Sequence, residues 1–336
     1  TFQRVYSGDQ GLFYGLIPGS DLLLDVDVSG NSIQDTVAFQ LSKRGNKWFA
    51  TATNHTDNAE FYVGSEIKRA SIGYFGIFQS ASLYSGPKFK ASDYETTIDH
   101  WAYLLQITGF CESKNFFNVM NTYDRAKFTF GFYQLAAHTP NDNLILLFRR
   151  FTESPKFKNY FPELKIINGA LHRVDENGSA TNLEIVMNTG PNGARQLQLF
   201  MNYLNPIRKK IDEQEVLHAA RLIHWAKNDK KMRDIQVDIA NEILQHKMSK
   251  VYHKRYDLDG ESDIICAAIA DIHHQGRASV KRVKIALASA NRLDALIDIN
   301  ANYTNRSAHL RQALKELTDA GKIGNKVYHA ATNEFV

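Results

Sequence analysis

The sequence predicts an α+β fold that is mainly helical, with a β-rich N-terminal region over residues 1–92 and a larger domain over residues 93–336. Two observations predict it. Short alternating or aromatic-rich runs, separated by turn-forming residues, fill the first region and indicate strands. From Asp93 onward, apolar residues recur at three- and four-residue spacing, which indicates helices. A chain of 336 residues is also long enough for two domains.

The N-terminal strands are expected at five runs: LLLDVDV, TVAFQL, KWFATATN, EFYVG and SIGYFGIF. The GN, RGN and TDN segments between them are hairpin turn signals. Two arrangements remain open. The region is either a separate module that binds a partner or a wall, or a β layer packed on the helical part.

The first helix is predicted over 98–108, capped by Thr96 or Thr97 and ending near Gly109, with Glu112 just beyond it. NDNLILLFRRF predicts a short helix capped by Asn141 or Asp142. An ENG turn between alternating runs predicts a β-hairpin insertion over 169–190. Further helices are expected over 194–204, 212–228, 231–252, 261–275, 279–290 and 306–320, with Gly260, Gly276 and Gly321 as stops.

Composition narrows the function classes. The apolar fraction of 43% and the charged fraction of 23% are typical of a globular protein, and no run reaches the roughly 18 apolar residues of a membrane span. The net charge is +4, and residues 206–256 carry twelve Lys and Arg against seven Asp and Glu. Such a surface favours an anionic polymer, although solvated helix faces explain it equally well. No nucleic-acid recognition motif is present, so nucleic acid is not an expected partner.

Neither a metal nor a cofactor is expected. Cys111 and Cys266 are the only cysteines and are predicted to be small buried thiols. His273 and His274 are adjacent, so they point in different directions on a helix. DLDGESD at 257–263 is explained by a helix-capping turn rather than by calcium. Trp101 and Trp225 are expected in the core.

The stretch from Phe110 to Leu135 carries the candidate chemistry. Glu112 follows an apolar helical run, and Asp124 comes after eleven intervening residues in a polar loop. The apolar neighbours of Glu112 would disfavour its ionised form, which suits a general acid. Asp124 lies beside Arg125, a cation that would keep it ionised as a base. Two carboxyl groups in different protonation states are what glycoside hydrolysis requires.

The order of Glu112, then Asp124, four residues, Thr129 and Gly131 resembles the catalytic stretch of bacterial chitosanases in the lysozyme superfamily. Phage-type lysozymes have a similar order. FGFYQL is also similar to the Gly-x-x-Gln of lytic transglycosylases and goose-type lysozymes. HWAKNDKKMRDIQVDIANEILQ and AAIADIHHQG resemble later chitosanase helices, so the resemblance covers about 95–290. The gap from Glu112 to Asp124 fits neither relative.

The resemblance implies a two-lobed catalytic domain around a cleft and a glycosidase that inverts at the anomeric carbon. In it Glu112 is the general acid, Asp124 is the general base, and Thr129 orients the attacking water. Substrate contacts are expected from Arg125, Gly131, Tyr133 and Gln134.

The expected partner is a β-1,4-linked amino-sugar polysaccharide. The basic helical half favours the anionic peptidoglycan over chitosan, the alternative substrate, which is a polycation and suits an acidic cleft. A rival is a non-catalytic protein that keeps the lysozyme-like fold as a binding or structural module. The chain starts at Thr1, and its first residues do not resemble a secretory leader. Two routes to the periplasm or cell wall are compatible with this start: secretion followed by trimming, and delivery within a larger assembly or parent chain.

Overall fold

The computed structural model describes residues 13–16, 23–26, 36–69 and 73–336. β1 (Phe13–Leu16) pairs with β2 (Leu23–Val26) in an antiparallel hairpin, so the centre of the predicted LLLDVDV strand is a strand. The ends of that run, the GN turn at 30–31 and the first residues of SIGYFGIF lie outside the described residues.

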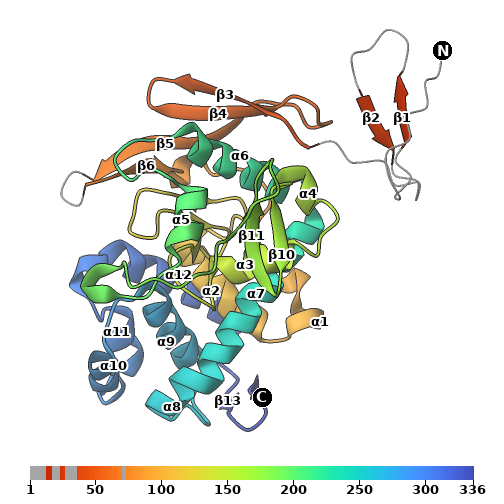
Figure 1. The fold of residues 1–336 in the computed structure, drawn as a ribbon. Helices are drawn as coiled ribbons and strands as arrows, with labels where there is room; N and C mark the ends of the chain where they lie inside the picture. Colours follow the sequence, from red (N-terminus) through yellow and green to blue (C-terminus); the bar gives the residue numbers. More distant parts are fainter. Residues whose placement is uncertain (1–12, 17–22, 27–35, 70–72) are drawn as a thin grey trace.

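Residues 39–136 contain a seven-stranded antiparallel sheet, whose first four strands lie at the top of the molecule in Figure 1. Its strands follow in chain order: β3 (Phe39–Arg44), β4 (Lys47–Ala52), β5 (Phe61–Arg69), β6 (Tyr74–Phe78), β7 (Met120–Asn121), β8 (Thr129–Phe130) and β9 (Leu135–Ala136). The predicted RGN turn joins β3 to β4, with Gly45 at φ 60 in the left-handed region. A two-residue hairpin turn requires such a conformation, which glycine adopts without a steric penalty.

This sheet joins the N-terminal strands to the segment that carries the candidate chemistry. Phe78 of β6 pairs with Asn121 of β7, and β7 pairs in turn with β8. From residue 36 onward, the N-terminal region is therefore a β layer continuous with later parts of the chain. The α+β class and the β-rich N-terminal region are confirmed.

Helices make up most of the rest. Their bounds are α1 (Glu95–Ile98), α2 (Trp101–Ser113), α3 (Leu144–Phe151), α4 (Phe157–Tyr160), α5 (Gln198–Leu204), α6 (Glu213–Asn228), α7 (Lys230–Lys247), α8 (His253–Tyr256), α9 (Asp263–Gln275), α10 (Val280–Leu287), α11 (Arg292–Ile297) and α12 (Thr304–Asp319). A π-helical turn, Met248–Tyr252, links α7 to α8. None of the helices in the described part of the chain is long and apolar enough to cross a membrane.

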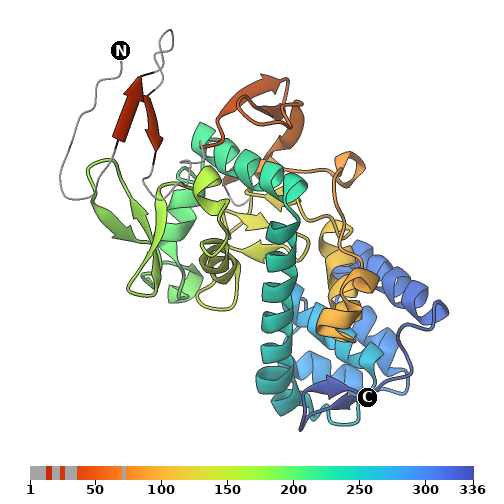
Figure 2. The ribbon, with the colours of Figure 1, turned by 90° about the vertical axis from the view of Figure 1, so that its right-hand side faces the viewer.

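The long helix α7 stands between two groups of elements in Figure 2. On one side lies a three-stranded sheet of β10 (Leu164–Ile167), β11 (Ala170–Val174) and β12 (Ala180–Asn182). The hairpin predicted within 169–190 is β11–β12, and β10 adds a strand that was not predicted. On the other side lie α2 and the C-terminal helices, with the hairpin of β13 (Tyr328–His329) and β14 (Glu334–Phe335). One cluster of buried apolar side chains runs through both groups, and α2 contacts α7, α9 and α12 within it. Trp101 and Trp225 are buried, as predicted.

Several local predictions are wrong. His100, not Thr96 or Thr97, precedes the first turn of α2, and α2 continues to Ser113, so Glu112 lies inside the helix. The cap of α3 is Asn143, whose side chain accepts from the Leu144 N–H. Of the predicted stops, Gly276 caps α9 at φ 70, and Gly321 directly follows Ala320, the cap of α12. Gly260 is not a stop, because α8 ends at Tyr256 and is capped by Asp257. Ser262 caps the start of α9, which confirms the capping turn in DLDGESD.

Candidate active site

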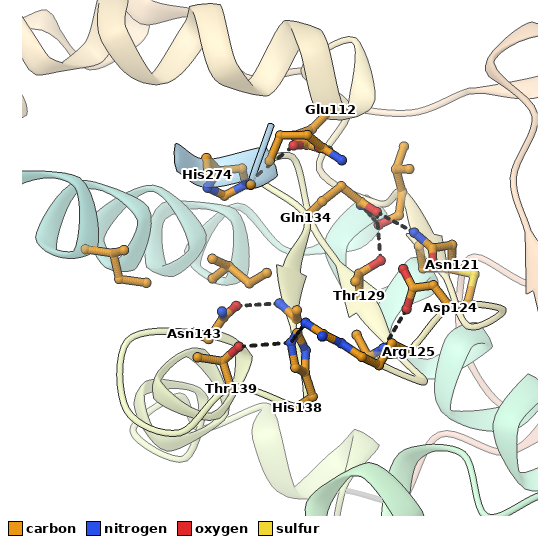
Figure 3. Close-up of a pocket in the computed structure, with 18 of the residues that line it drawn as sticks. Glu112, Asn121, Asp124, Arg125, Thr129, Gln134, His138, Thr139, Asn143 and His274 are labelled. Atoms are coloured by element: carbon orange, nitrogen blue, oxygen red, sulfur yellow. Dashed lines mark hydrogen bonds and ion pairs between the residues drawn. The ribbon is translucent and has the colours of Figure 1, made fainter. Parts of the chain in front are cut away.

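A polar cavity of about 690 Å³ lies where the β7–β9 segment meets the ends of α2, α7 and α9. Figure 3 shows its walls: Glu112 from α2 and His274 from α9 on one side, and the side chains of residues 121–143 on the other. Five of the seven residues predicted for the site line this cavity, namely Glu112, Asp124, Arg125, Thr129 and Gln134.

Glu112 is placed by the end of α2. The helix stops because Lys114 and Asn115 take left-handed conformations, at φ 55 and 66. The Ser113 hydroxyl donates to the Phe132 carbonyl at 2.7 Å, which ties this helix end to the turn between β8 and β9. These contacts leave the Glu112 carboxyl at the cavity wall with 14% of its side chain exposed.

Burial dominates the electrostatics of Glu112. It raises the pKa of the carboxyl above its usual range, although the positive charge of Arg306 acts in the opposite direction. Arg306 Nη1 lies 2.8 Å from Glu112 Oε1, and His274 Nε2 lies 3.6 Å from the same oxygen. Burial lowers the pKa of His274 to about 3, so this imidazole is neutral at pH 7. Glu112 is therefore held beside one cation and one neutral ring.

The Arg306 charge is shared. Its guanidinium also binds the buried Asp271, with Nη2 2.6 Å from Oδ1, and Asp271 Oδ2 in turn accepts from Arg277 Nη2 at 2.9 Å. Glu112, Arg306, Asp271 and Arg277 thus form a chain in which acidic and basic side chains alternate. Neither arginine was among the predicted site residues. Asp271 and His274 fall in AAIADIHHQG, one of the stretches that carry the resemblance, but no sequence signal connects Arg306 to Glu112.

Asp124 lies on the opposite wall, in the loop between β7 and β8. Its Oδ1 accepts from the Ala126 N–H at 2.8 Å, an Asx turn that fixes the carboxyl in place. Burial raises the pKa of Asp124, and the Ala126 N–H and the Arg125 charge lower it by less. Burial therefore outweighs the Arg125 charge, because the loop buries Asp124 more than its polar sequence suggests.

Thr129, at the start of β8, is oriented by Gln134. The Thr129 hydroxyl donates to Gln134 Oε1 at 2.9 Å, and Asn121 Nδ2 donates to the same oxygen at 3.2 Å. The Gln134 amide nitrogen donates to the carbonyls of Val119 and Gly131. Because the Thr129 proton is engaged, its oxygen lone pairs can accept a hydrogen bond from a molecule in the cavity. Gln134 fixes this orientation.

The cavity carries few uncompensated charges. Arg125 Nη2 lies 3.3 Å from His138 Nε2, and burial lowers the pKa of His138 to about 4. Lys247 at the end of α7 and Asp142 near the start of α3 add one charge of each sign. The wall thus combines carboxyl groups with cations and neutral rings and is not strongly acidic.

Two predicted substrate contacts are placed away from the cavity. Tyr133 is 4% exposed and packs on His274, with ring centroids 4.4 Å apart. Gly131 has φ 90, and a Cβ there would lie 2.5 Å from Gln236 Oε1. This position therefore excludes side chains because the turn presses against α7. Both residues therefore lie behind the side chains that line the cavity.

Among the described residues, no group of three or more His, Cys, Asp or Glu side chains is arranged to hold a metal ion. Both cysteines are free thiols, and burial raises the pKa of each. A scan of protein-family models and searches of curated proteins and solved structures found no match to this chain.

Proposed function

We propose that the protein is a glycoside hydrolase that cleaves β-1,4 linkages of an amino-sugar polymer, with peptidoglycan as its substrate. One observation carries the proposal: a glutamic acid with a raised pKa and a second carboxyl group, with an oriented threonine, line one polar cavity. A buried acid beside the glycosidic oxygen and a carboxylate beside a water molecule are the two groups that this reaction needs.

In the proposed mechanism, protonated Glu112 donates its proton to the glycosidic oxygen as the bond to the anomeric carbon breaks. Asp124 removes a proton from a water molecule that attacks this carbon from the opposite face. The Thr129 oxygen accepts a hydrogen bond from the same water, since its own proton is directed to Gln134. Attack from the opposite face inverts the anomeric configuration. Arg125 contacts the sugar chain at the rim.

Charge favours peptidoglycan over chitosan. A polycation is best received by an acidic cleft, but here Arg125 and Lys247 offset carboxyl groups whose pKa values burial raises. We therefore place the activity at the bacterial cell wall, reached by secretion or by delivery within a larger assembly or parent chain. Chitosan remains the second substrate to test.

The competing function is wall binding without catalysis. Glu112 could then serve only the ion pairs that join α2, α9 and α12. Such ion pairs also shift pKa values, so the raised pKa of Glu112 alone does not distinguish catalysis from binding. A binding module, however, has no need of a second carboxyl and an oriented hydroxyl across the same cavity.

Clearing of purified cell walls by wild type and by Glu112→Gln separates these functions. Wild type should lower turbidity and release reducing ends, and the variant should lose about 10²–10⁴-fold of the rate, the usual contribution of a general acid. Glu215→Gln is the matched control, because Glu215 is a buried glutamate outside the cavity. Equal clearing by wild type and Glu112→Gln would end the assignment. Release of reducing ends from chitosan but not from cell walls would make chitosan the assigned substrate. Mass spectrometry of the fragments separates hydrolysis from transglycosylation, which leaves an anhydro end.

A further inference from the structure

A second cavity, of about 420 Å³, lies beside the first and shares Arg125 with it. Its cationic lining residues are Arg125, Lys127 and Arg208, and no acidic residue lines it in the part of the chain that the structure describes. The remaining walls come from β6, the loop after β12 and α5, and are mostly neutral and polar. Three positive charges around one small cavity create a local potential that favours an anion.

Lys127 and Arg208 both contact neutral side chains at this cavity. Lys127 Nζ donates to Asn202 Oδ1 at 2.7 Å, and Gln198 Nε2 donates to the same oxygen at 2.8 Å. The Arg208 guanidinium lies over the Tyr74 ring, 3.8 Å from its centroid. Burial and the nearby Arg208 charge lower the pKa of Lys127, and the more weakly acting Glu215 charge raises it. An anion in this cavity would therefore offset repulsion between Lys127 and Arg208.

Arg125 decides which anion is expected. Its side chain lines both cavities, so a group bound in the second is within reach of a polymer bound in the first. An arginine fork and an ammonium group suit a carboxylate. A flat aromatic platform for a nucleic-acid base is not offered, because Arg208 covers the Tyr74 ring.

We propose that the second cavity is a subsite for a carboxylate-bearing branch of the polymer whose backbone occupies the first cavity. This inference rests on the proposed function and deepens it, because it assigns the preference for a branched, anionic wall glycan to named residues. Bare amino-sugar strands, which have no such branch, would fill the first cavity alone.

The test compares two soluble substrates, wall glycan strands that carry their peptide branches and bare strands of N-acetylglucosamine. Bare strands without any branch point are needed because removing the peptides by hydrolysis would leave a carboxylate at each branch point. Wild type should have a lower KM for branched strands. Lys127→Gln and Arg208→Gln should each raise that KM about tenfold, with little effect on kcat, which is the size expected for one charge-assisted hydrogen bond. The effect on bare strands should be smaller. Arg195→Gln is the matched control, because Arg195 is exposed in the neighbouring loop and lines neither cavity.

An equal change in KM for branched and bare strands, or no change in either variant, would overturn the subsite. Competition by a glycerol-phosphate polymer but not by branched strands would overturn the carboxylate assignment. Failure of the proposed function has a different signature, because wild type would release no reducing ends from either substrate. Fluorescence anisotropy with labelled branched strands would then still report the subsite, as tighter binding that Lys127→Gln weakens.

Discussion

Replacing Arg306 by glutamine should move the alkaline limb of the pH–activity profile to higher pH. Arg306 lowers the pKa of Glu112 through a contact of 2.8 Å, while burial raises it. Without that positive charge the carboxyl stays protonated, and therefore active as an acid, to a higher pH. Glutamine keeps a donor for Asp271, which also retains Arg277 at 2.9 Å.

The contact distance bounds the size of the effect. Two unit charges 2.8 Å apart interact by about 6 kcal/mol at an effective dielectric of about 20, which is a ceiling for this pair. A carboxyl beside an arginine usually has its pKa lowered by about 1–3 units. The alkaline limb should therefore move upward by about 1–3 pH units. Loss of a partner from a buried ion pair also costs about 3–5 kcal/mol of stability. The rates should therefore be measured well below the unfolding temperature of the variant.

The assay is kcat/KM for a soluble amino-sugar oligomer from pH 4 to 10. Arg311→Gln is the matched control: it lies on the same helix, α12, and pairs with Asp294 and Asp298 at the surface. Its alkaline limb should coincide with that of wild type. An Arg306→Gln profile that stays in place or moves to lower pH, in protein shown to be folded, would refute the role assigned to Glu112.

Two further predictions concern stability. Glu215 is buried and bonded to Thr122, and burial raises its pKa to about 7 from 4.5. The folded state thus holds more protons than the unfolded state between these pH values, and stability falls as pH rises through this window, by about 3 kcal/mol. In denaturant titrations from pH 4 to 8, the free energy of unfolding of Glu215→Gln should rise relative to that of wild type. The same pH dependence of this free energy in both proteins would contradict the prediction. Gly131→Ala should cost about 1–3 kcal/mol because φ is 90 and the new Cβ meets Gln236. An unchanged melting temperature would show that the turn can move.

The sequence predicted most elements whose signals are local. The N-terminal strands and the hairpin at β11–β12 have turn residues at the required positions. Helices α6, α7 and α9 have apolar periodicity with polar caps, and α12 has the periodicity alone. Caps were less certain where equivalent residues compete. In NDN, Asn141 takes φ 66, and Asn143 caps α3 while also accepting from the Ala136 N–H. That second contact comes from β9, so tertiary structure chose the cap.

In the candidate site, too, the residues that are close in sequence could be predicted and those brought in by tertiary structure could not. Glu112, Asp124 and Thr129 lie within one short stretch, and the structure places all three around one cavity. Arg306 could not be connected to Glu112 because it comes from a distant helix, and its charge is indistinguishable in sequence from the exposed Arg311. The second cavity likewise needs α5 and the loop after β12 to fold beside Lys127.

The most direct measurement of the central claim compares Glu112→Gln with wild type on two substrates that differ only in leaving group. A natural amino-sugar oligomer needs a proton on its departing oxygen, whereas an oligomer with a dinitrophenyl leaving group does not. If Glu112 is the general acid, the variant should lose about 10²–10⁴-fold on the natural linkage and remain within about tenfold of wild type on the activated one. An equal loss on both substrates, or no loss on either, would contradict it.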